Sequence, residues 1–315
     1  MPSRHLLDPE LEPMLAIASQ MKFVPGEPSP IMQAMMAAPP PVSDKVETRE
    51  VKVPGPAGAP DVRCLLYLPK DASQPRPAIL HIHGGGYILG APEMSAPANM
   101  KWAEDFGAVV LSVDYRLAPM TKHPGPVEDC YAALAWLFGQ AGEFGIDTTR
   151  LGVAGESAGG GLAAALALLA RDRGEFPLAF QHLIFPMIDD RTVTQADPSP
   201  YIGQYLWTRE ANIAGWTSLL DCPPGSDDVS PYAAAARAED VAGLPPTYLA
   251  CGALDLFIEE NLEYVRRLIR AGVPVEMHVY PGAPHGFHMM ADAAVTRTAT
   301  RDALTALGKA LAKGG

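Results

Sequence analysis

The chain has 315 residues, of which 48% are hydrophobic and 19% charged, and its formal net charge is −12. These values are typical of a globular protein with one large core, and the negative charge disfavours nucleic acid and anionic lipid as partners. No apolar run approaches the roughly 18 to 20 residues of a membrane span, and the acidic N-terminus has no signal-peptide h-region, so we expect no stable membrane anchor. The four cysteines lack pair or metal spacing, which predicts free thiols in a reducing cytoplasm.

Residues 1–45 differ in composition from the rest of the chain. Short helices are predicted around residues 11–22 and 30–37, and a proline-rich joint separates them from the remainder of the chain. Five methionines gather here: Met14, Met21, Met32, Met35 and Met36. Two interpretations stay open, because flexible methionines suit both gap filling against the core and a pliable apolar cover over a substrate channel.

From residue 47 onward, strand-like runs alternate with helix-like runs. An opening antiparallel pair is predicted, followed by buried strands and amphipathic or apolar helices, the last of which ends at Gly272 as its C-cap. The expected strands are 51–53, 62–67, 78–83, 108–113, 150–154, 182–188, 247–251 and 275–280, and the expected helices are 126–138, 160–171 and 259–271. This rhythm predicts an α/β fold with a mostly parallel sheet and helices on both faces.

Residues 190–235 interrupt the rhythm, because they contain two tryptophans, turn-rich edges and no strand. Thr208 is the expected N-cap of a helix through Leu220. An insertion at the carboxyl end of a sheet strand lies where active-site covers lie in α/β folds. We therefore expect residues 190–235 to be an insertion that covers a catalytic domain of residues 46–189 and 236–315.

Two glycine motifs carry the chemistry. Gly155-Glu156-Ser157-Ala158-Gly159 has the G-x-S-x-G pattern of the nucleophile elbow, a strand-to-helix turn that exposes a serine hydroxyl. His83-Gly84-Gly85-Gly86 has the form of a loop that offers backbone N–H groups to an oxyanion. Each motif is weak alone in a chain with 29 glycines. Together, each after an apolar strand, they predict a serine hydrolase.

A serine nucleophile needs a base and an acid that orients it, in the chain order Ser, Asp or Glu, His. His285 follows the last predicted strand and is the expected base, with His288 as the runner-up. Asp255 follows strand 247–251, but Asp189 and Asp190 follow strand 182–188 and also satisfy the order. Position favours Asp255 modestly, and the alternatives have capping or arginine-pairing roles open to them.

Backbone N–H groups are the expected oxyanion donors. Ala158 follows the nucleophile, and Gly85 and Gly86 have no side chain to block a substrate oxygen. His83 is expected to hold the loop. The strained turn is expected to direct Glu156 away from the serine hydroxyl, which favours a supporting hydrogen-bond role for it.

Five motifs in order resemble those of the hormone-sensitive-lipase-like esterases (bacterial family IV) of the α/β-hydrolase fold, from about residue 76 to residue 287. They are His83–Gly86, Asp114–Pro119, Gly155–Gly160, Asp255–Phe257 and His285–Phe287. The resemblance implies Ser157, Asp255 and His285 as the catalytic triad, and a helical cap built from residues 1–45 and 190–235. Two positions depart from the family pattern: Met120 stands where a glutamate is usual, and Leu256 stands where a proline is frequent.

The resemblance implies a serine carboxylesterase for short- to medium-chain acyl esters, working through an acyl-enzyme with no metal or organic cofactor. An amidase or deacetylase with the same triad is the alternative, and a non-catalytic small-molecule receptor is a weaker one, since receptor-like relatives have lost the histidine. The expected partner is a small acyl ester. The family suggests a homodimer through the sheet edge, while the oligomeric state itself stays open.

Overall fold

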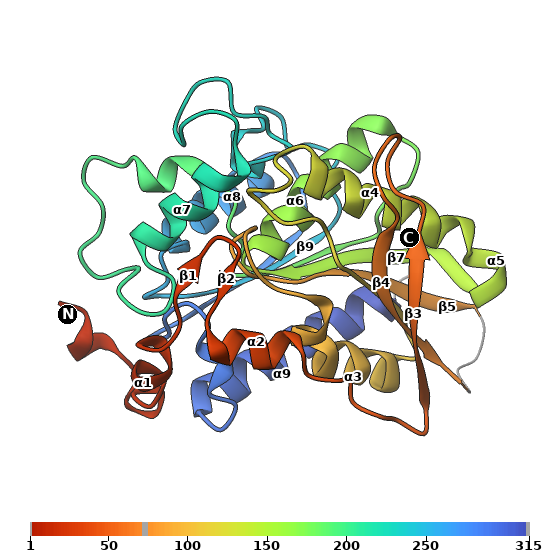
Figure 1. Ribbon diagram of the computed structural model, residues 1–315, viewed down its shortest axis with the longest axis horizontal. Helices are drawn as coiled ribbons and strands as arrows, with labels where there is room; N and C mark the ends of the chain where they lie inside the picture. The colour runs from red at the N-terminus through yellow and green to blue at the C-terminus, as the bar shows by residue number, and fades with distance from the viewer. Residues whose placement is uncertain (1, 71–74, 313–315) are drawn as a thin grey trace.

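The computed structural model describes residues 2–70 and 75–312 and is built around an eight-stranded sheet, in the order β10-β9-β8-β7-β5-β6-β4-β3 (Figure 1). β4 pairs antiparallel with β3 and β6, and all other neighbours are parallel. The strands are β3 Val46–Val53, β4 Val62–Pro69, β5 Arg76–Ile82, β6 Val109–Val113, β7 Ile146–Glu156, β8 Gln181–Ile184, β9 Thr247–Gly252 and β10 Val275–Tyr280. The predicted α/β class and mostly parallel sheet are confirmed.

Helices cover both faces of this sheet. In Figure 1, α3 and α9 lie below the sheet, and α4, α6 and α8 lie above it. Because side chains alternate across a strand, Ile79 and Val110 pack with α3 and α9, whereas their neighbours Leu80 and Leu111 join the cluster that contains α6. The helices are α3 Ala96–Phe106, α4 Gly125–Gly139, α5 Ala141–Phe144, α6 Ala158–Arg173, α8 Ile258–Arg270 and α9 Ala294–Ala312.

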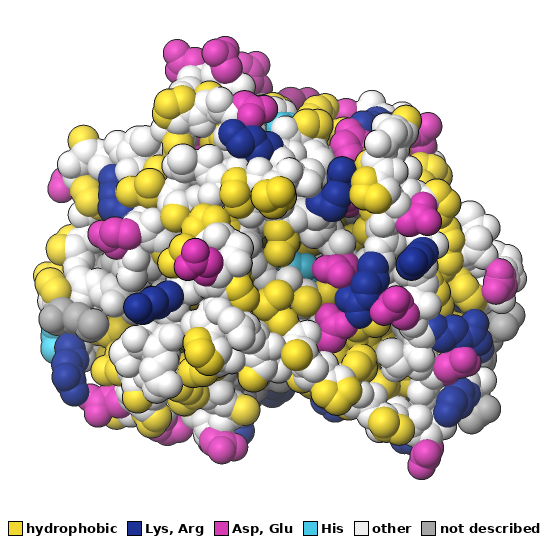
Figure 2. Space-filling model, viewed as in Figure 1, with side chains coloured by type: hydrophobic (Ala, Val, Ile, Leu, Met, Phe, Trp, Pro, Cys, Tyr) yellow, Lys and Arg dark blue, Asp and Glu magenta, His cyan; other side chains and the backbone are white. Residues whose placement is uncertain are grey.

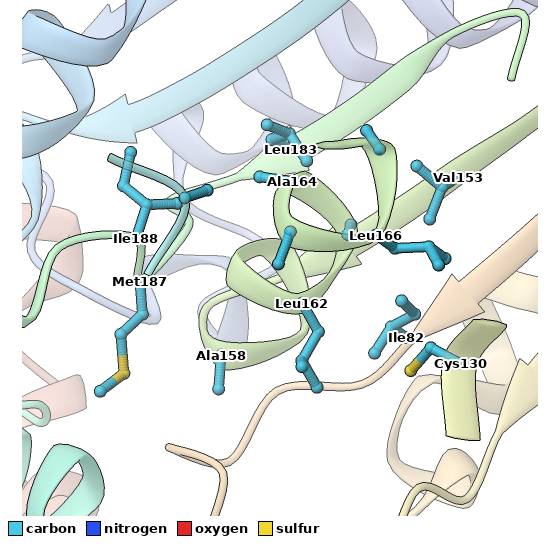
Figure 3. Close-up of a cluster of buried hydrophobic side chains, with 14 of the residues drawn as sticks. Ile82, Cys130, Val153, Ala158, Leu162, Ala164, Leu166, Leu183, Met187 and Ile188 are labelled. Atoms are coloured by element: carbon cyan, nitrogen blue, oxygen red, sulfur yellow. The ribbon is translucent and has the colours of Figure 1, made fainter. Parts of the chain in front are cut away.

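Helix α6, which starts directly after Ser157, is buried on all sides. Every residue from Ala158 to Ala170 is buried, as expected for a helix that is apolar all round. Figure 3 shows Leu162 and Leu166 of α6 among side chains from the neighbouring strands and loops, including Ile82 and Val153. The N-terminal end of α6, which follows Ser157, is therefore rigidly anchored in the core.

The N-terminal segment and the mid-chain insertion contact each other. The ring of Phe23 packs edge-on against Trp207, with 4.8 Å between centroids, and the Ser3 hydroxyl donates to Gln204 Oε1 at 2.8 Å. Thr208 caps the insertion helix by accepting from the N–H of Ala211, as predicted. These segments contain α1 Met14–Ala18, α2 Pro30–Met36, α7 Arg209–Leu219 and the hairpin of β1 Phe23–Val24 and β2 Glu27–Pro28.

One predicted strand is shorter than expected. β8 ends at Ile184 instead of residue 188, because Phe185 has a φ of +36° and Pro186 has no N–H for a sheet ladder. The 3₁₀ turns are η1 Arg4–Leu6, η2 Pro9–Leu11, η3 Pro92–Ser95, η4 Asp190–Val193, η5 Ala235–Arg237 and η6 Phe287–Met289.

The cysteine prediction is confirmed, because Cys64, Cys130, Cys222 and Cys251 are all free and only Cys222 is not fully buried. Within residues 2–70 and 75–312, no helix has the length and apolar content to cross a membrane. Acidic and basic side chains are interspersed over the face in Figure 2, with hydrophobic side chains gathered near its centre.

His182 of β8 makes folding stability depend on pH. Its ring is buried and stacks on Tyr248 at 4.5 Å, and burial lowers the pKa of His182 to about 3. Because the unfolded chain keeps a histidine pKa near 6.5, the unfolded state gains a proton first as the pH falls. Stability is therefore lost below pH 6.5, by about 2 kcal/mol between pH 6.5 and 5.

We expect His182→Phe to remove this part of the acid sensitivity. The measurement is urea unfolding of the wild type and the variant at both pH values. His278, a half-buried histidine on the neighbouring strand β10, provides the control His278→Phe. Parallel pH profiles of the wild type and His182→Phe would contradict the assignment.

Candidate active site

Ser157 lies at the tip of a strained turn between β7 and α6. Its φ of +55° and ψ of −121° are rare for a residue with a side chain, and such strain occurs where surrounding structure imposes it. The Ser157 N–H donates to the carbonyl of Ile184, and its own carbonyl accepts from the N–H groups of Gly161 and Met187, each at 2.9 Å. The turn is thereby fixed by the chain after β8 and by helix α6.

The glycines on either side of Ser157 are required by close packing. A Cβ on Gly155 would lie 2.3 Å from the carbonyl oxygen of Gly159, and a Cβ on Gly159 would lie 2.0 Å from that of Ile82. Both distances are far inside van der Waals contact with backbone atoms that have no room to move. The G-x-S-x-G pattern is therefore a steric requirement of this turn.

A continuous hydrogen-bond chain joins Ser157 to His285 and Asp255. Ser157 Oγ lies 3.0 Å from His285 Nε2, and His285 Nδ1 lies 2.8 Å from Asp255 Oδ2. The other carboxylate oxygen, Oδ1, accepts from the N–H of Phe257 at 3.0 Å. Asp255 is fully buried, and Ser157 and His285 are each 6% exposed. The three residues follow β7, β10 and β9, whose carboxyl ends meet at one edge of the sheet.

The other candidate acids have different partners. Asp189 forms an ion pair with Arg191 at 2.8 Å, and Asp190 forms one with Arg237 at 2.8 Å. In the part of the chain that the structure describes, neither aspartate has a hydrogen bond to His285. The structure thus brings Asp255 to His285, and it gives the other two aspartates the arginine-pairing role that was their alternative.

His288, the other candidate base, lies near the site in a different role. Its ring stacks on Phe185, with 5.3 Å between centroids and 20° between ring planes. Between described residues, the Ser157 hydroxyl has its histidine hydrogen bond with His285 and not with His288.

The glycine loop after β5 lies beside the nucleophile with its backbone exposed to the site. Gly85 has a φ of +125°, and a Cβ there would lie 2.0 Å from the carbonyl oxygen of Leu89. A Cβ on Gly86 would lie 2.1 Å from the ring of Trp207. None of the hydrogen bonds between described residues uses the N–H of Gly85, Gly86 or Ala158 as a donor, so these three groups are available to a bound oxygen.

His83 stabilises this loop through ring stacking and hydrogen bonds. Its ring stacks on Tyr115 at 4.4 Å, and its Nδ1 lies 2.8 Å from the carbonyl oxygen of Gly84. The Tyr115 hydroxyl donates to the His83 carbonyl at 3.0 Å. These contacts are those of a structural residue.

Glu156 links the elbow to the glycine loop. Its carboxylate accepts from the Ser95 hydroxyl at 2.6 Å and from the Gly84 N–H at 3.3 Å, and it lies 3.0 Å from His81 Nε2. Burial by itself raises the pKa of Glu156, but the charge and hydrogen bond of His81 and the hydrogen bond of Ser95 outweigh it and lower the pKa to about 2. The ionised carboxylate therefore holds the loop in register with Ser157.

Replacing this carboxylate by an amide is expected to loosen the loop. Since a hydrogen bond to a charged group contributes about 1.5–3 kcal/mol, we expect Glu156→Gln to lower stability by about 2 kcal/mol and kcat for p-nitrophenyl acetate roughly tenfold. The stability loss should shrink as the pH falls from 4.5 towards 2, because the unfolded wild-type chain, whose glutamate pKa is near 4.5, takes up a proton over this range while the folded carboxylate stays ionised. Glu128→Gln, at a surface pair with Arg173, is the control, and an unchanged kcat in Glu156→Gln would contradict the role.

The cavity above Ser157 is small and mostly apolar, with a volume of about 120 Å³. Its walls come from Ser157, His285 and the glycine loop, and from the N-terminal segment and the mid-chain insertion. The N-terminal segment contributes Met21, Phe23, Met32 and Met35, and the mid-chain insertion contributes Leu206 and Trp207. Both segments therefore lie over the nucleophile.

Phe185 is a site residue that sequence reasoning missed. Its ring packs edge-on against His285, with 4.8 Å between centroids and 68° between ring planes. In the sequence it lies inside the apolar run of residues 182–188, and Pro186 is the only signal that the strand ends there. Across the described ranges, no group of three or more His, Cys, Asp or Glu side chains is arranged to hold a metal ion.

Comparison with known proteins identifies the family of the chain. A family model described as the alpha/beta hydrolase fold matches residues 79–289. Carboxylesterase NlhH of Mycobacterium tuberculosis is 34% identical over 274 residues, which cover 85% of this chain and 83% of that protein. Ethyl acetate hydrolase of Pseudomonas putida is 32% identical over 214 residues, which cover 68% and 66%.

A solved structure titled bacterial heroin esterase is 42% identical, superposes with a TM-score of 0.89, and covers 98% of each chain. The chain therefore belongs to the hormone-sensitive-lipase-like (bacterial family IV) carboxylesterases of the α/β-hydrolase fold and is a carboxylic ester hydrolase.

Proposed function

We propose that the protein hydrolyses short- to medium-chain acyl esters, with Ser157, His285 and Asp255 as its catalytic triad and the N–H groups of Gly85, Gly86 and Ala158 as its oxyanion hole. The observation that carries the proposal is the hydrogen-bond chain from Ser157 Oγ through the His285 ring to Asp255, next to three backbone donors that have no protein acceptor among the described residues.

In the first half-reaction, Ser157 Oγ attacks the ester carbonyl carbon while His285 Nε2 takes the hydroxyl proton. Asp255 keeps the other ring proton on Nδ1 and stabilises the imidazolium that forms. The carbonyl oxygen becomes an oxyanion at the free N–H groups, each of which contributes about 3–4 kcal/mol to transition-state stability in comparable sites. His285 then gives its proton to the leaving alcohol, and the acyl group stays on Ser157.

In the second half-reaction, water attacks the acyl-enzyme and His285 takes a proton from it. The second tetrahedral intermediate collapses, the carboxylic acid leaves, and the proton returns to Ser157 Oγ. Because both triad ends are almost inaccessible to bulk solvent, the charges that form are stabilised mainly by fixed dipoles of the protein.

Residues 1–45 and 190–235 form the cap of this site. The position of the two segments supports this assignment, because apolar side chains of both segments line the cavity over Ser157. The segments also contact each other through Phe23 and Trp207. The 120 Å³ cavity favours a small acyl ester, as does the similarity to an ethyl acetate hydrolase.

The test is hydrolysis of p-nitrophenyl esters from acetate to palmitate, together with the matching acetanilide, by the wild type and Ser157→Ala. We expect the highest kcat/KM among the shorter esters and loss of turnover in the variant. Faster cleavage of the anilide than of the ester would replace the esterase with an amidase or deacetylase. Tight ligand binding without turnover of any substrate would favour a receptor.

A further inference from the structure

A second cavity opens beside the active site, between helices α3 and α9 on one face of the sheet. Its volume is about 350 Å³. Figure 1 shows both helices below the sheet. The outer walls are carbon side chains, Ala98 and Trp102 from α3 and Ala299, Ala303 and Leu304 from α9. Ala98 is exposed to solvent, so the cavity is a groove open at its outer end, which we call the α3–α9 groove.

The inner end of the groove adjoins the cavity above Ser157. Five residues line both spaces: Met94, Ser95, Glu156, Phe185 and His288. The ring of Phe185 contacts the catalytic candidate His285 edge-on at 4.8 Å and stacks on His288 at 5.3 Å. The rings of Phe185 and His288 therefore lie where the groove adjoins the space next to Ser157.

The sizes of the two spaces indicate how a larger substrate is accommodated. Small-molecule sites in proteins usually measure about 300–1,000 Å³, whereas the cavity at Ser157 measures about 120 Å³. The groove supplies about 350 Å³ more. For any ester whose volume exceeds that of the cavity above Ser157, the groove provides adjacent free volume that extends to the protein surface.

The chemistry of the lining identifies the occupant. Ala299 and Ala303 lie one helical turn apart on α9, and with Ala98 they leave space that larger side chains would fill. Among the polar residues of the lining, Glu156 and Ser95 are hydrogen-bonded to each other at the inner end. Hydrocarbon gains free energy on leaving water for such a surface, and a charged group loses it.

We propose that the α3–α9 groove binds one apolar arm of the ester whose carbonyl is at Ser157. The proposal rests on the proposed function and extends it, because it assigns the accommodation of long substrates to helices α3 and α9 in addition to the cap. Since each buried methylene contributes about 0.8 kcal/mol, every CH₂ group excluded from the groove lowers affinity about fourfold.

The test narrows the groove from each wall separately. Ala303→Phe adds a ring from α9, and Ala98→Phe adds one from α3, so that a folding defect in one variant leaves the other informative. Thr305→Phe adds the same ring to α9 at an exposed position outside the lining and is the control. Two substrate series are compared: p-nitrophenyl esters from acetate to decanoate, and acetate esters from ethyl to octyl.

We expect both groove variants to lower the ratio of kcat/KM for the longest member to that for the shortest at least tenfold in one series, and Thr305→Phe to leave it within twofold of wild type. The affected series identifies the arm as acyl or alcohol. Unchanged ratios in both series with both groove variants would overturn the proposal.

Binding without turnover separates this proposal from the catalytic one. In the Ser157→Ala background, calorimetric titration with octanoate and with 1-octanol is expected to show at least tenfold weaker binding of one ligand when Ala303→Phe or Ala98→Phe is added. Weaker binding in these variants would support ligand binding in the α3–α9 groove even if the wild type hydrolysed no ester. In that case the proposed esterase function would be wrong, and the proposal about the groove would remain supported. Equal affinities of both ligands in all variants would overturn the proposal that the α3–α9 groove binds an apolar arm.

Discussion

Ser157→Ala is expected to lower kcat for p-nitrophenyl acetate by about 10⁶-fold, the size of loss that removal of a serine nucleophile causes in comparable enzymes. The alanine removes the atom that forms the acyl-enzyme in the proposed mechanism, and it leaves His285 and Asp255 hydrogen-bonded to each other. Since the Ser157 side chain is small and its backbone bonds are unaffected, the unfolding free energy should change by less than about 1 kcal/mol.

The decisive comparison is single-turnover and steady-state hydrolysis by the wild type, Ser157→Ala and Ser226→Ala. Ser226 lies in the mid-chain insertion, where its hydroxyl donates to the carbonyl of Pro223, and its alanine variant should have wild-type kcat. A burst of p-nitrophenol is expected only from the two proteins that keep Ser157. Activity of Ser157→Ala above one hundredth of wild type would assign the nucleophile elsewhere.

Much of the site could be predicted because parallel strands bring their carboxyl ends together. Ser157, Asp255 and His285 each follow a strand-like run, and the observed strands β7, β9 and β10 end at the same edge of the sheet. The glycines could be predicted for a related reason. Their lack of a side chain is required wherever a backbone approaches another at contact distance, as Gly159 does with Ile82.

The choice between Asp255 and Asp189 required three dimensions or a family resemblance. Both follow strands, and both precede His285 in the chain. The order of strands separates them: β9, which precedes Asp255, is the direct neighbour of β10, whereas β8, which precedes Asp189, is one strand further away. Sequence order alone does not contain that neighbour relation.

Helices α3 and α9 were not predicted, and the α3–α9 groove therefore had no signal in the sequence. The fully buried positions of α9 are few (Thr296, Ala306, Leu307 and Leu311), and the alanines that leave the groove open are small residues with weak hydropathy. Pro92 lies in the first turn of η3 and Pro97 in the first turn of α3, where proline suits the start of an element. The inner sides of α3 and α9 are buried because both helices cover a face of the sheet. Local hydrophobic periodicity in the sequence does not indicate which face a helix covers.

The early end of strand β8 also depends on tertiary structure that the local sequence pattern does not indicate. Residues 182–188 form an apolar run with no glycine, which is compatible with a longer strand. In the structure, the Phe185 N–H donates to the carbonyl of Ala250 in β9 and its backbone turns to positive φ. This turn places the Phe185 ring beside His285, so the local pattern fails where the active site imposes a strained conformation.

Asp255→Asn is the second change with a very large expected effect. We expect kcat for p-nitrophenyl acetate to fall about 10⁴-fold, the loss that the same substitution causes in another Ser-His-Asp enzyme. The asparagine carbonyl can keep the bond from the Phe257 N–H, which Asp255 Oδ1 accepts at 3.0 Å. Its NH₂ group then faces His285 Nδ1, so the ring proton moves to Nε2 and the ring has no lone pair for the Ser157 proton.

Asp189→Asn is the matched control, because Asp189 is the other acid that follows the correct chain order and its partner is Arg191. It should retain kcat within about twofold, and with its carboxylate partly exposed its surface ion pair contributes no more than about 1 kcal/mol to stability. Thermal unfolding of both variants separates misfolding from a wrong tautomer: Asp255→Asn should be folded yet almost inactive. If Asp189→Asn were the inactive variant, the hydrogen bond between Asp255 and His285 would be a structural contact, and the catalytic acid would have to reach His285 in a conformation different from this one.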